Sequence, residues 1–482
     1  MRRKTKLTEG PINAQLAKLT LPMILGLFSM VAFNLVDTFF VGKIGVWGPV
    51  DLIGSGSISP DEQSKMALAA LGFTLPVVMI LGAIGMGLSM GASAVISKAI
   101  GEDDNDKVRR LTVDSLVLAV TFALTFVVLG LLTMDPLFRL LGAEGMTLTL
   151  VKEYMYTWYI GVTFVIVPFV GNSAIRANGD TRTPAAIMTS MVVLNIILDP
   201  IFIFGLGPVP ALGMMGAALA TVIARGFSLV LGLWVLKRNQ MLTREVPQLA
   251  KALKSWQSIL YVGLPAAATN LVVPLTTALI TNLVSTYGEN AVAALGVAAR
   301  IDLFAIMVVV ALSTVLGPFV GQNLGAKKFD RLWTGVSSSQ RFGLLWGLLM
   351  LVVIWSTKSY IAALFTESPE VIDAIIVYLT VVPFGYAFRC IYALDNTILN
   401  VLNRPLVASG ITISMMFGVY LPLAYLGSYL FGLIGVFSAI GIAYFVGGSA
   451  SYFFVKKVIG NVREEKQAEE AKVLELKVQG EA

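Results

Sequence analysis

The sequence predicts an all-α polytopic membrane protein, and two features of its composition and one of its pattern support this fold class. Hydrophobic residues make up 56% of the 482 residues and charged residues only 13%, whereas a soluble chain carries about 25% charged residues. The mean hydropathy is +0.81. The apolar residues form runs long enough to cross a bilayer as helices, which need roughly 20 residues each, and too long for the strands of a membrane barrel.

Twelve such runs are bounded by charges or by clusters of Gly and Pro. Because lipid offers no partner for backbone polar groups, each run is expected to form a helix. The predicted spans cover residues 15–42, 67–98, 108–134, 152–176, 184–207, 213–237, 257–286, 291–320, 333–357, 370–401, 405–430 and 432–456.

Composition also excludes several classes of function. The chain has no histidine and a single cysteine, Cys390, which rules out His-based catalytic sites, disulfides within the chain and Cys clusters for zinc or iron–sulfur. The basic residues behind the net charge of +6 lie between apolar runs rather than on one polar face, which disfavours nucleic-acid binding. We therefore expect a protein of the lipid bilayer that is not an enzyme and has neither a cofactor nor a nucleic-acid partner.

The Lys and Arg residues predict how the chain is oriented. Arg2, Arg3, Lys4 and Lys6 precede a first run that is too long for a cleaved signal peptide. With the N-terminus inside, most of the 35 Lys and Arg residues fall in inner segments, as the positive-inside rule requires. The prediction is a multi-pass protein of the cell (inner or plasma) membrane with both termini in the cytoplasm.

The chain contains two copies of a six-span unit. ALAALG at 67–72 recurs as AVAALG at 291–296, and the same separation relates Asn172 to Asn396. Because six spans return the chain to the side from which it started, the copies are parallel, a symmetry found in transporters that alternate access between two halves. The predicted domains are an N-terminal six-helix lobe (1–240), an inner loop (241–256), a pseudo-symmetric C-terminal six-helix lobe (257–460) and a charged tail (461–482).

Ionisable residues at membrane depth are costly and usually functional, and the first of them is Asp37 in the first span. No basic residue lies within one helical turn of it. Asn34 precedes it by three residues and therefore shares its side of the helix. The alternative is a structural role, in which a protonated Asp37 hydrogen-bonds to a neighbouring helix.

The second such residue is Asp199, in the sequence NIILDP of the fifth span. Asn195 lies four residues earlier on the same helical face, and Pro200 lacks the amide that would bond to the carbonyl of Ile196. Carboxylate, amide and free carbonyl oxygens at one level suit a proton or a small hard cation, to which Thr221 of the sixth span adds a hydroxyl. The alternative is a proline kink with an incidental buried acid.

These motifs together resemble the multidrug and toxic compound extrusion (MATE) family over about residues 12–458. The pairing of the acid in the first span with Asn-x3-Asp-Pro in the fifth is similar to the branch that includes the DNA-damage-inducible F type and archaeal members. The motifs are VDTFFVGKIG at 36–45, ALAALG at 67–72, IRANGDTRTP at 175–184, NIILDP at 195–200, GAALATVIAR at 216–225 and ALGVAARID at 294–302.

The resemblance implies the MATE fold and efflux of cationic amphiphilic compounds driven by inward flow of H+ or Na+. It also implies cation-site roles for Asp37, Asn195, Asp199 and Thr221, of which the first three are the candidate Na+ ligands. A carboxylate, an amide and a carbonyl serve H+ and Na+ alike, so the coupling ion stays open.

The second half departs from another branch of the family, the NorM type, which carries acids in its seventh and tenth spans. Here the seventh span has none, and the tenth carries Asp395. Asp395 is either a second coupling site or the partner of Arg389, six residues earlier. Arg300 and Asp302 at the start of the eighth span are expected to form a structural pair.

The predicted function is a secondary antiporter that exports small organic cations, among them drugs and toxins, in exchange for H+ or Na+ by alternating access. We expect it to act as a monomer. A lipid-linked precursor flippase of the same superfamily is the alternative, but the mainly acidic charges at membrane depth favour cationic cargo. Because Ile280 stands where the repeat would place an equivalent of Asp37, coupling is expected in the N-terminal lobe.

Overall fold

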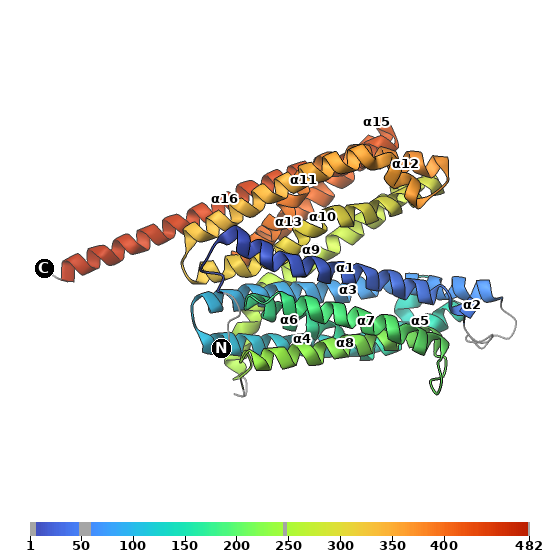
Figure 1. Ribbon diagram of the computed structural model, residues 1–482, viewed down its shortest axis with the longest axis horizontal. Coiled ribbons are helices and arrows are strands. Elements are labelled where there is room, and N and C mark those ends of the chain that lie inside the picture. The colour runs from blue at the N-terminus through green and yellow to red at the C-terminus, as the bar shows by residue number, and fades with distance from the viewer. Residues whose placement is uncertain (1–5, 48–58, 244–247, 481–482) are drawn as a thin grey trace. The chain divides into compact units, whose positions relative to one another are not determined.

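The computed structural model describes residues 6–47, 59–243 and 248–480, with side chains up to residue 464. Helices make up almost all of this part of the chain, and no sheet occurs in it (Figure 1). Within these residues eleven helices are long and apolar enough to cross a membrane, and the count rises to twelve when one bent pair is taken as a single span. Each predicted span overlaps one of these, so the all-α polytopic fold class is confirmed.

The helices of the first half carry five continuous spans and one bent span. They are α1 (Ile12–Val41), α2 (Ile44–Trp47), α3 (Pro60–Gly101), α4 (Asn105–Leu140), α5 (Gly145–Ile160), α6 (Val162–Ala177), α7 (Arg182–Phe204) and α8 (Gly213–Arg238).

The helices of the second half follow the same order, and the last of them continues through the charged tail. They are α9 (Leu249–Ser285), α10 (Glu289–Gly325), α11 (Phe329–Phe365), α12 (Pro369–Val381), the 3-10 turn η1 (Val382–Gly385), α13 (Tyr386–Val401), α14 (Pro405–Ile413), the π-helix η2 (Ser414–Tyr420), α15 (Leu421–Phe431) and α16 (Leu433–Gly480).

The fourth span of each half is broken near its middle. In the first half α5 and α6 meet with a bend of 46° at Gly161, where a Cβ would lie only 2.2 Å from the Val222 side chain of α8. In the second half the turn η1, which contains Pro383, separates α12 from α13. Proline removes a helical hydrogen bond and glycine permits close approach, so Pro383 accounts for the second break and the packing of α8 against Gly161 for the first.

The two halves also pack their helices in the same way. In the first half α6 packs against α3, α4 and α8, and in the second half α13 packs against α10, α11 and α16. The broken span therefore occupies the same central place within each half.

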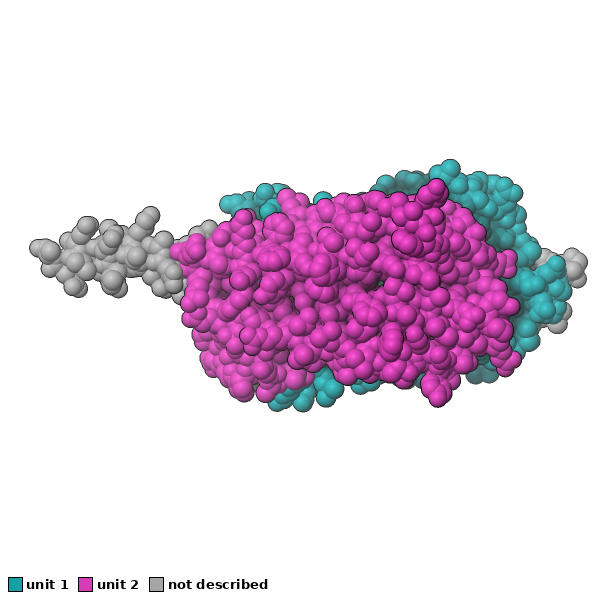
Figure 2. Space-filling model, turned by 90° about the horizontal axis from the view of Figure 1, so that it is seen from above, with its two compact units in different colours: residues 1–6, 18–271 teal, residues 7–17, 272–482 magenta. Residues whose placement is uncertain are grey.

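Contacts divide the chain into two compact units (Figure 2). Unit 1 consists of residues 1–6 and 18–271, and unit 2 of residues 7–17 and 272–482. The division falls inside α9, after the predicted inner loop at 241–256, of which 244–247 lie outside the described residues. The lobe boundaries inferred from the repeat stay a prediction.

The first turn of α1 belongs to unit 2 because Arg331 of α11 holds the segment before it. The guanidinium of Arg331 donates to the carbonyl oxygens of Leu7 (3.1 Å), Glu9 (2.8 Å) and Gly10 (2.6 Å). Arg331 also donates to the side chain of Gln15 at 3.0 Å. One charged group thus satisfies several backbone acceptors and fixes where the helix carrying Asp37 begins.

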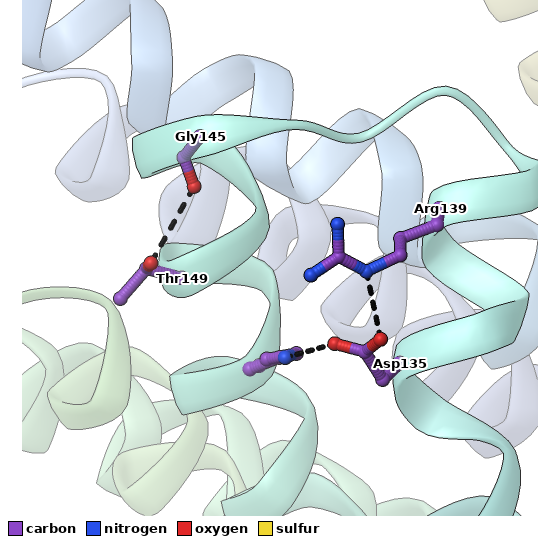
Figure 3. A network of polar contacts seen from close by, with 5 residues as sticks. Asp135, Arg139, Gly145 and Thr149 are labelled. Carbon is purple, nitrogen blue, oxygen red and sulfur yellow. Dashed lines mark hydrogen bonds and ion pairs between the residues drawn. The ribbon is translucent and has the colours of Figure 1, made fainter.

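A surface ion-pair network fixes the turn between α4 and α5 (Figure 3). Asp135, near the end of α4, accepts a hydrogen bond from Arg139 at 2.7 Å and forms an ion pair with Lys152 of α5. This network holds the first piece of the broken span against the third span.

Candidate functional site

A small apolar cluster positions the three helices that carry the candidate acids. Phe33 of α1 packs in unit 1 with Met191 and Val192 of α7 and with Ala224 of α8, all of them buried. Each lies about one helical turn or less from a polar residue of the site. The polar side chains therefore project from helices whose spacing is set by close-packed apolar contacts.

Asn195 and Asp199 form the most deeply buried part of the site. Both side chains are 0% exposed, and the Asn195 amide donates to Oδ1 of Asp199 at 2.9 Å. Oδ2 of Asp199 and Oδ1 of Asn195 have no hydrogen-bond partner. The spacing of four residues thus does place the two side chains together, with one oxygen of each left unpaired.

Asp37 and Thr221 complete the set of oxygen atoms. Asp37 is half-buried, and its buried Oδ1 has no partner; Oγ1 of the buried Thr221 has none either. Asp37 and Asp199 are close enough for their charges to interact. Buried polar atoms are nearly always paired, so unpaired oxygens on α1, α7 and α8 indicate a place for an exchangeable species.

The chemistry of these atoms fits H+ or Na+. Two carboxylates, an amide and a hydroxyl are hard oxygen donors of the kind that small hard cations bind. The described residues contain no group of three or more His, Cys, Asp or Glu side chains that could hold a metal ion. Asn34, by contrast, is exposed and donates to the carbonyl oxygen of Met30 in its own helix at 3.3 Å, which leaves it outside the buried set.

Two residues of the site were missed by sequence reasoning. Arg225 of α8 interacts electrostatically with Asp37, and its guanidinium lies 5.8 Å from the centre of the Phe33 ring. Tyr154 of α5 interacts with Asp37, Asp199 and Arg225. Arg225 had a usable signal, because it is an ionisable residue inside a span and lies one turn after Thr221.

Asp395 lies in unit 2 and is fully paired. Its Oδ1 accepts from the Gln340 amide of α11 at 2.6 Å, and its Oδ2 accepts from the Ser451 hydroxyl of α16 at 3.1 Å. The expected alternative partner, Arg389, is instead bound to Asp302 at 2.7 Å. That alternative is therefore wrong: the spacing of six residues places Asp395 and Arg389 on different faces of α13.

The expected pair of Arg300 and Asp302 is wrong for a related reason. Asp302 is buried and receives Arg389 together with the hydroxyls of Tyr378 and Tyr386, whereas Arg300 is exposed. Residues two apart on a helix do not face each other, so the buried acid of α10 takes its cation from α13.

Comparisons with known proteins cover both halves of the chain. A sequence model of the family named MatE matches residues 61–201 and 265–426. The FAD transporter of Shewanella oneidensis is 32% identical over 464 residues, which are 96% of this chain and 98% of that protein. The multidrug export protein MepA of Staphylococcus aureus is 25% identical over 439 residues, which are 90% of this chain and 91% of that protein. The solved structure of the Vibrio cholerae MATE transporter VcmN in its bent form has a TM-score of 0.84 and 29% identity, and the match covers 94% of this chain and 98% of that chain.

Proposed function

Because this chain belongs to the MATE family, whose members are transporters and not enzymes, we propose that it is a secondary antiporter that exports organic compounds in exchange for H+ or Na+. The observation that carries the proposal is the set of unpaired buried oxygens on Asp37, Asn195, Asp199 and Thr221. We propose that it is a multi-pass protein of the cell membrane and acts as a monomer. The distribution of Lys and Arg supports an orientation with both termini in the cytoplasm.

The proposed exchange follows from the charge of the site. An organic cation and a coupling cation both gain from the carboxylates of Asp37 and Asp199, and two carboxylates hold only a limited positive charge in a low-dielectric setting. Entry of H+ or Na+ from outside therefore weakens the hold on the organic cation and favours its release. Asp395 has both oxygens paired, so we assign it a role in the rate or the substrate preference rather than in coupling.

Cationic amphiphilic compounds are the first proposed class of substrate, because the acidic residues at membrane depth favour cations. A relative named as a multidrug export protein supports this class. The FAD transporter and MepA are named for flavin and drug transport, so the lipid-linked precursor flippase is not proposed.

A second candidate function is export of a flavin dinucleotide. Two observations favour it: the similarity to a protein named as an FAD transporter and the electrostatic interaction of Arg225 with Asp37. FAD carries an anionic pyrophosphate, which a guanidinium binds well.

Reconstituted protein in liposomes separates the two candidates. Movement of ethidium and of FAD is measured with an imposed H+ gradient, an imposed Na+ gradient, and neither. We expect ethidium to move only with one of the gradients. Movement of FAD without ethidium would make the second candidate the function, and movement of neither under any gradient would contradict coupled export.

The affinity for a cationic substrate is expected to weaken as pH falls. Protonation of Asp37 and Asp199 removes negative charge, so a cation is held less tightly at low pH. The measurement is the dissociation constant of ethidium for the purified protein in detergent between about pH 8 and about pH 5. An Asp395→Asn control should keep the pH dependence, and a constant that does not change with pH would count against direct competition.

A further inference from the structure

Among the described residues, Arg225 is the one basic residue that interacts electrostatically with Asp37. Its buried Nε has no hydrogen-bond partner, and neither has Oδ1 of Asp37. No ion pair joins Arg225 to Asp37 in the described part of the chain, although such pairs occur elsewhere in it. The two charges therefore interact across a gap, and each keeps an unpaired atom.

Unit 2 provides an internal comparison for this arrangement. The repeat that relates Asn172 to Asn396 also relates Tyr154 to Tyr378. Tyr378 belongs to a buried cluster in which Arg389 binds Asp302 directly at 2.7 Å, with the Asp302 carboxylate also accepting from Tyr378 at 2.8 Å. A buried tyrosine thus lies beside an arginine and an acid in both units.

The two clusters differ in how their charges are satisfied. In unit 2 one acid and one arginine cancel, and Asp302 and Arg389 have no unpaired buried atoms. In unit 1 Arg225 acts electrostatically on Asp37, Asp199 interacts with Asp37, and both acids keep an unpaired oxygen. The unit 2 cluster is therefore neutral and its charged atoms are all paired. In the unit 1 cluster, two ionised acids and one arginine leave an excess of one negative charge.

We propose that Arg225 is a resident countercharge that limits the site of Asp37 and Asp199 to one exchangeable monovalent cation. This inference rests on the proposed function and specifies its ion capacity. With Arg225 in place, a single added cation makes the site neutral, and a second would leave a net positive charge inside the membrane, which is costly. Without Arg225 the same two carboxylates carry two negative charges, which two monovalent cations would neutralise.

Binding of Na+ alone to the purified full-length protein in detergent tests this inference without transport. Equilibrium binding of radioactive Na+ is measured for the wild type, Arg225→Gln and Arg225→Lys at one alkaline pH. We expect Arg225→Gln to bind one Na+ more per protein than the wild type, with an affinity at least about tenfold higher, because a nearby positive charge has been removed. Arg225→Lys keeps the charge and should match the wild type.

A charge-balanced pair of variants keeps the test decisive if Arg225→Gln does not fold. Asp37→Asn leaves one acid and one arginine and should lose Na+ binding. The double variant Asp37→Asn/Arg225→Gln restores one excess negative charge and should regain it. An Arg225→Gln protein with the Na+ count and affinity of the wild type would overturn the inference, as would a double variant that binds no more Na+ than Asp37→Asn.

Transport by the wild type separates failure of this inference from failure of the proposed function. If the wild type exports ethidium only with a cation gradient while Arg225→Gln leaves Na+ binding unchanged, only the role of Arg225 is wrong. If the wild type shows no gradient dependence, coupled export itself is wrong, whatever the Na+ count.

Discussion

Asp199→Asn is expected to reduce efflux of ethidium from cells to the level of cells without the transporter, while the protein is still produced and folded. The variant keeps the size of the side chain and removes a charge that is 0% exposed and has an unpaired oxygen. Because an amide neither releases a proton nor balances a cation, efflux is no longer coupled to the cation gradient. Drug resistance of cells and the amount of protein in the membrane are measured together.

A matched control for Asp199→Asn exists in the second half. Asp395 is equally buried, but both of its oxygens have protein donors, so Asp395→Asn should keep gradient-driven efflux. Full resistance to ethidium with both Asp37→Asn and Asp199→Asn would show that the cation site has been assigned to the wrong residues.

Arg389→Met is expected to have the largest effect on stability, because it leaves Asp302 buried without its cation. Breaking a buried pair from one side costs about 3–5 kcal/mol, and the Arg389 guanidinium also stacks over the Tyr444 ring at 4.9 Å. The cluster joins α10 to both sides of the break between α12 and α13. Its loss should therefore lower the melting temperature of the protein in detergent by many degrees.

Arg300→Gln is the control for Arg389→Met. Arg300 is exposed, so its replacement should leave the melting temperature within about 2 °C of the wild type. The double variant Asp302→Asn/Arg389→Met should be less destabilised than the sum of its two single variants, since neither charge is then left alone. A melting temperature of Arg389→Met equal to that of Arg300→Gln would contradict the structural role of the buried pair.

The twelve spans were predictable because every backbone polar group in lipid must be paired within the protein, which favours long apolar helices. Each helix can therefore be predicted from its own local sequence. The broken fourth spans were not predicted. Gly161 lies in an apolar run like many other glycines, and only the approach of Val222 from another helix shows why a glycine is needed there.

The site was only partly predictable, and the difference lies in how far apart the residues are in the chain. Asn195 and Asp199 lie one turn apart, so helix geometry alone brings them together. Arg225, Tyr154 and Asp37 lie near one another only because α8, α5 and α1 pack together. Local sequence patterns do not predict this packing. The predicted partner of Arg389 was wrong for the same reason, because the observed partner, Asp302, belongs to a different helix.

The gradient dependence of transport in Asp199→Asn and Asp395→Asn tests most directly whether coupling belongs to the first half. The two proteins are reconstituted in liposomes, and ethidium efflux is compared with the imposed H+ or Na+ gradient intact and collapsed. The ratio of the two rates should fall to one in Asp199→Asn and stay as in the wild type in Asp395→Asn, whatever the absolute rates. A ratio that is lost in Asp395→Asn but kept in Asp199→Asn would contradict the assignment and place the coupling site in the second half.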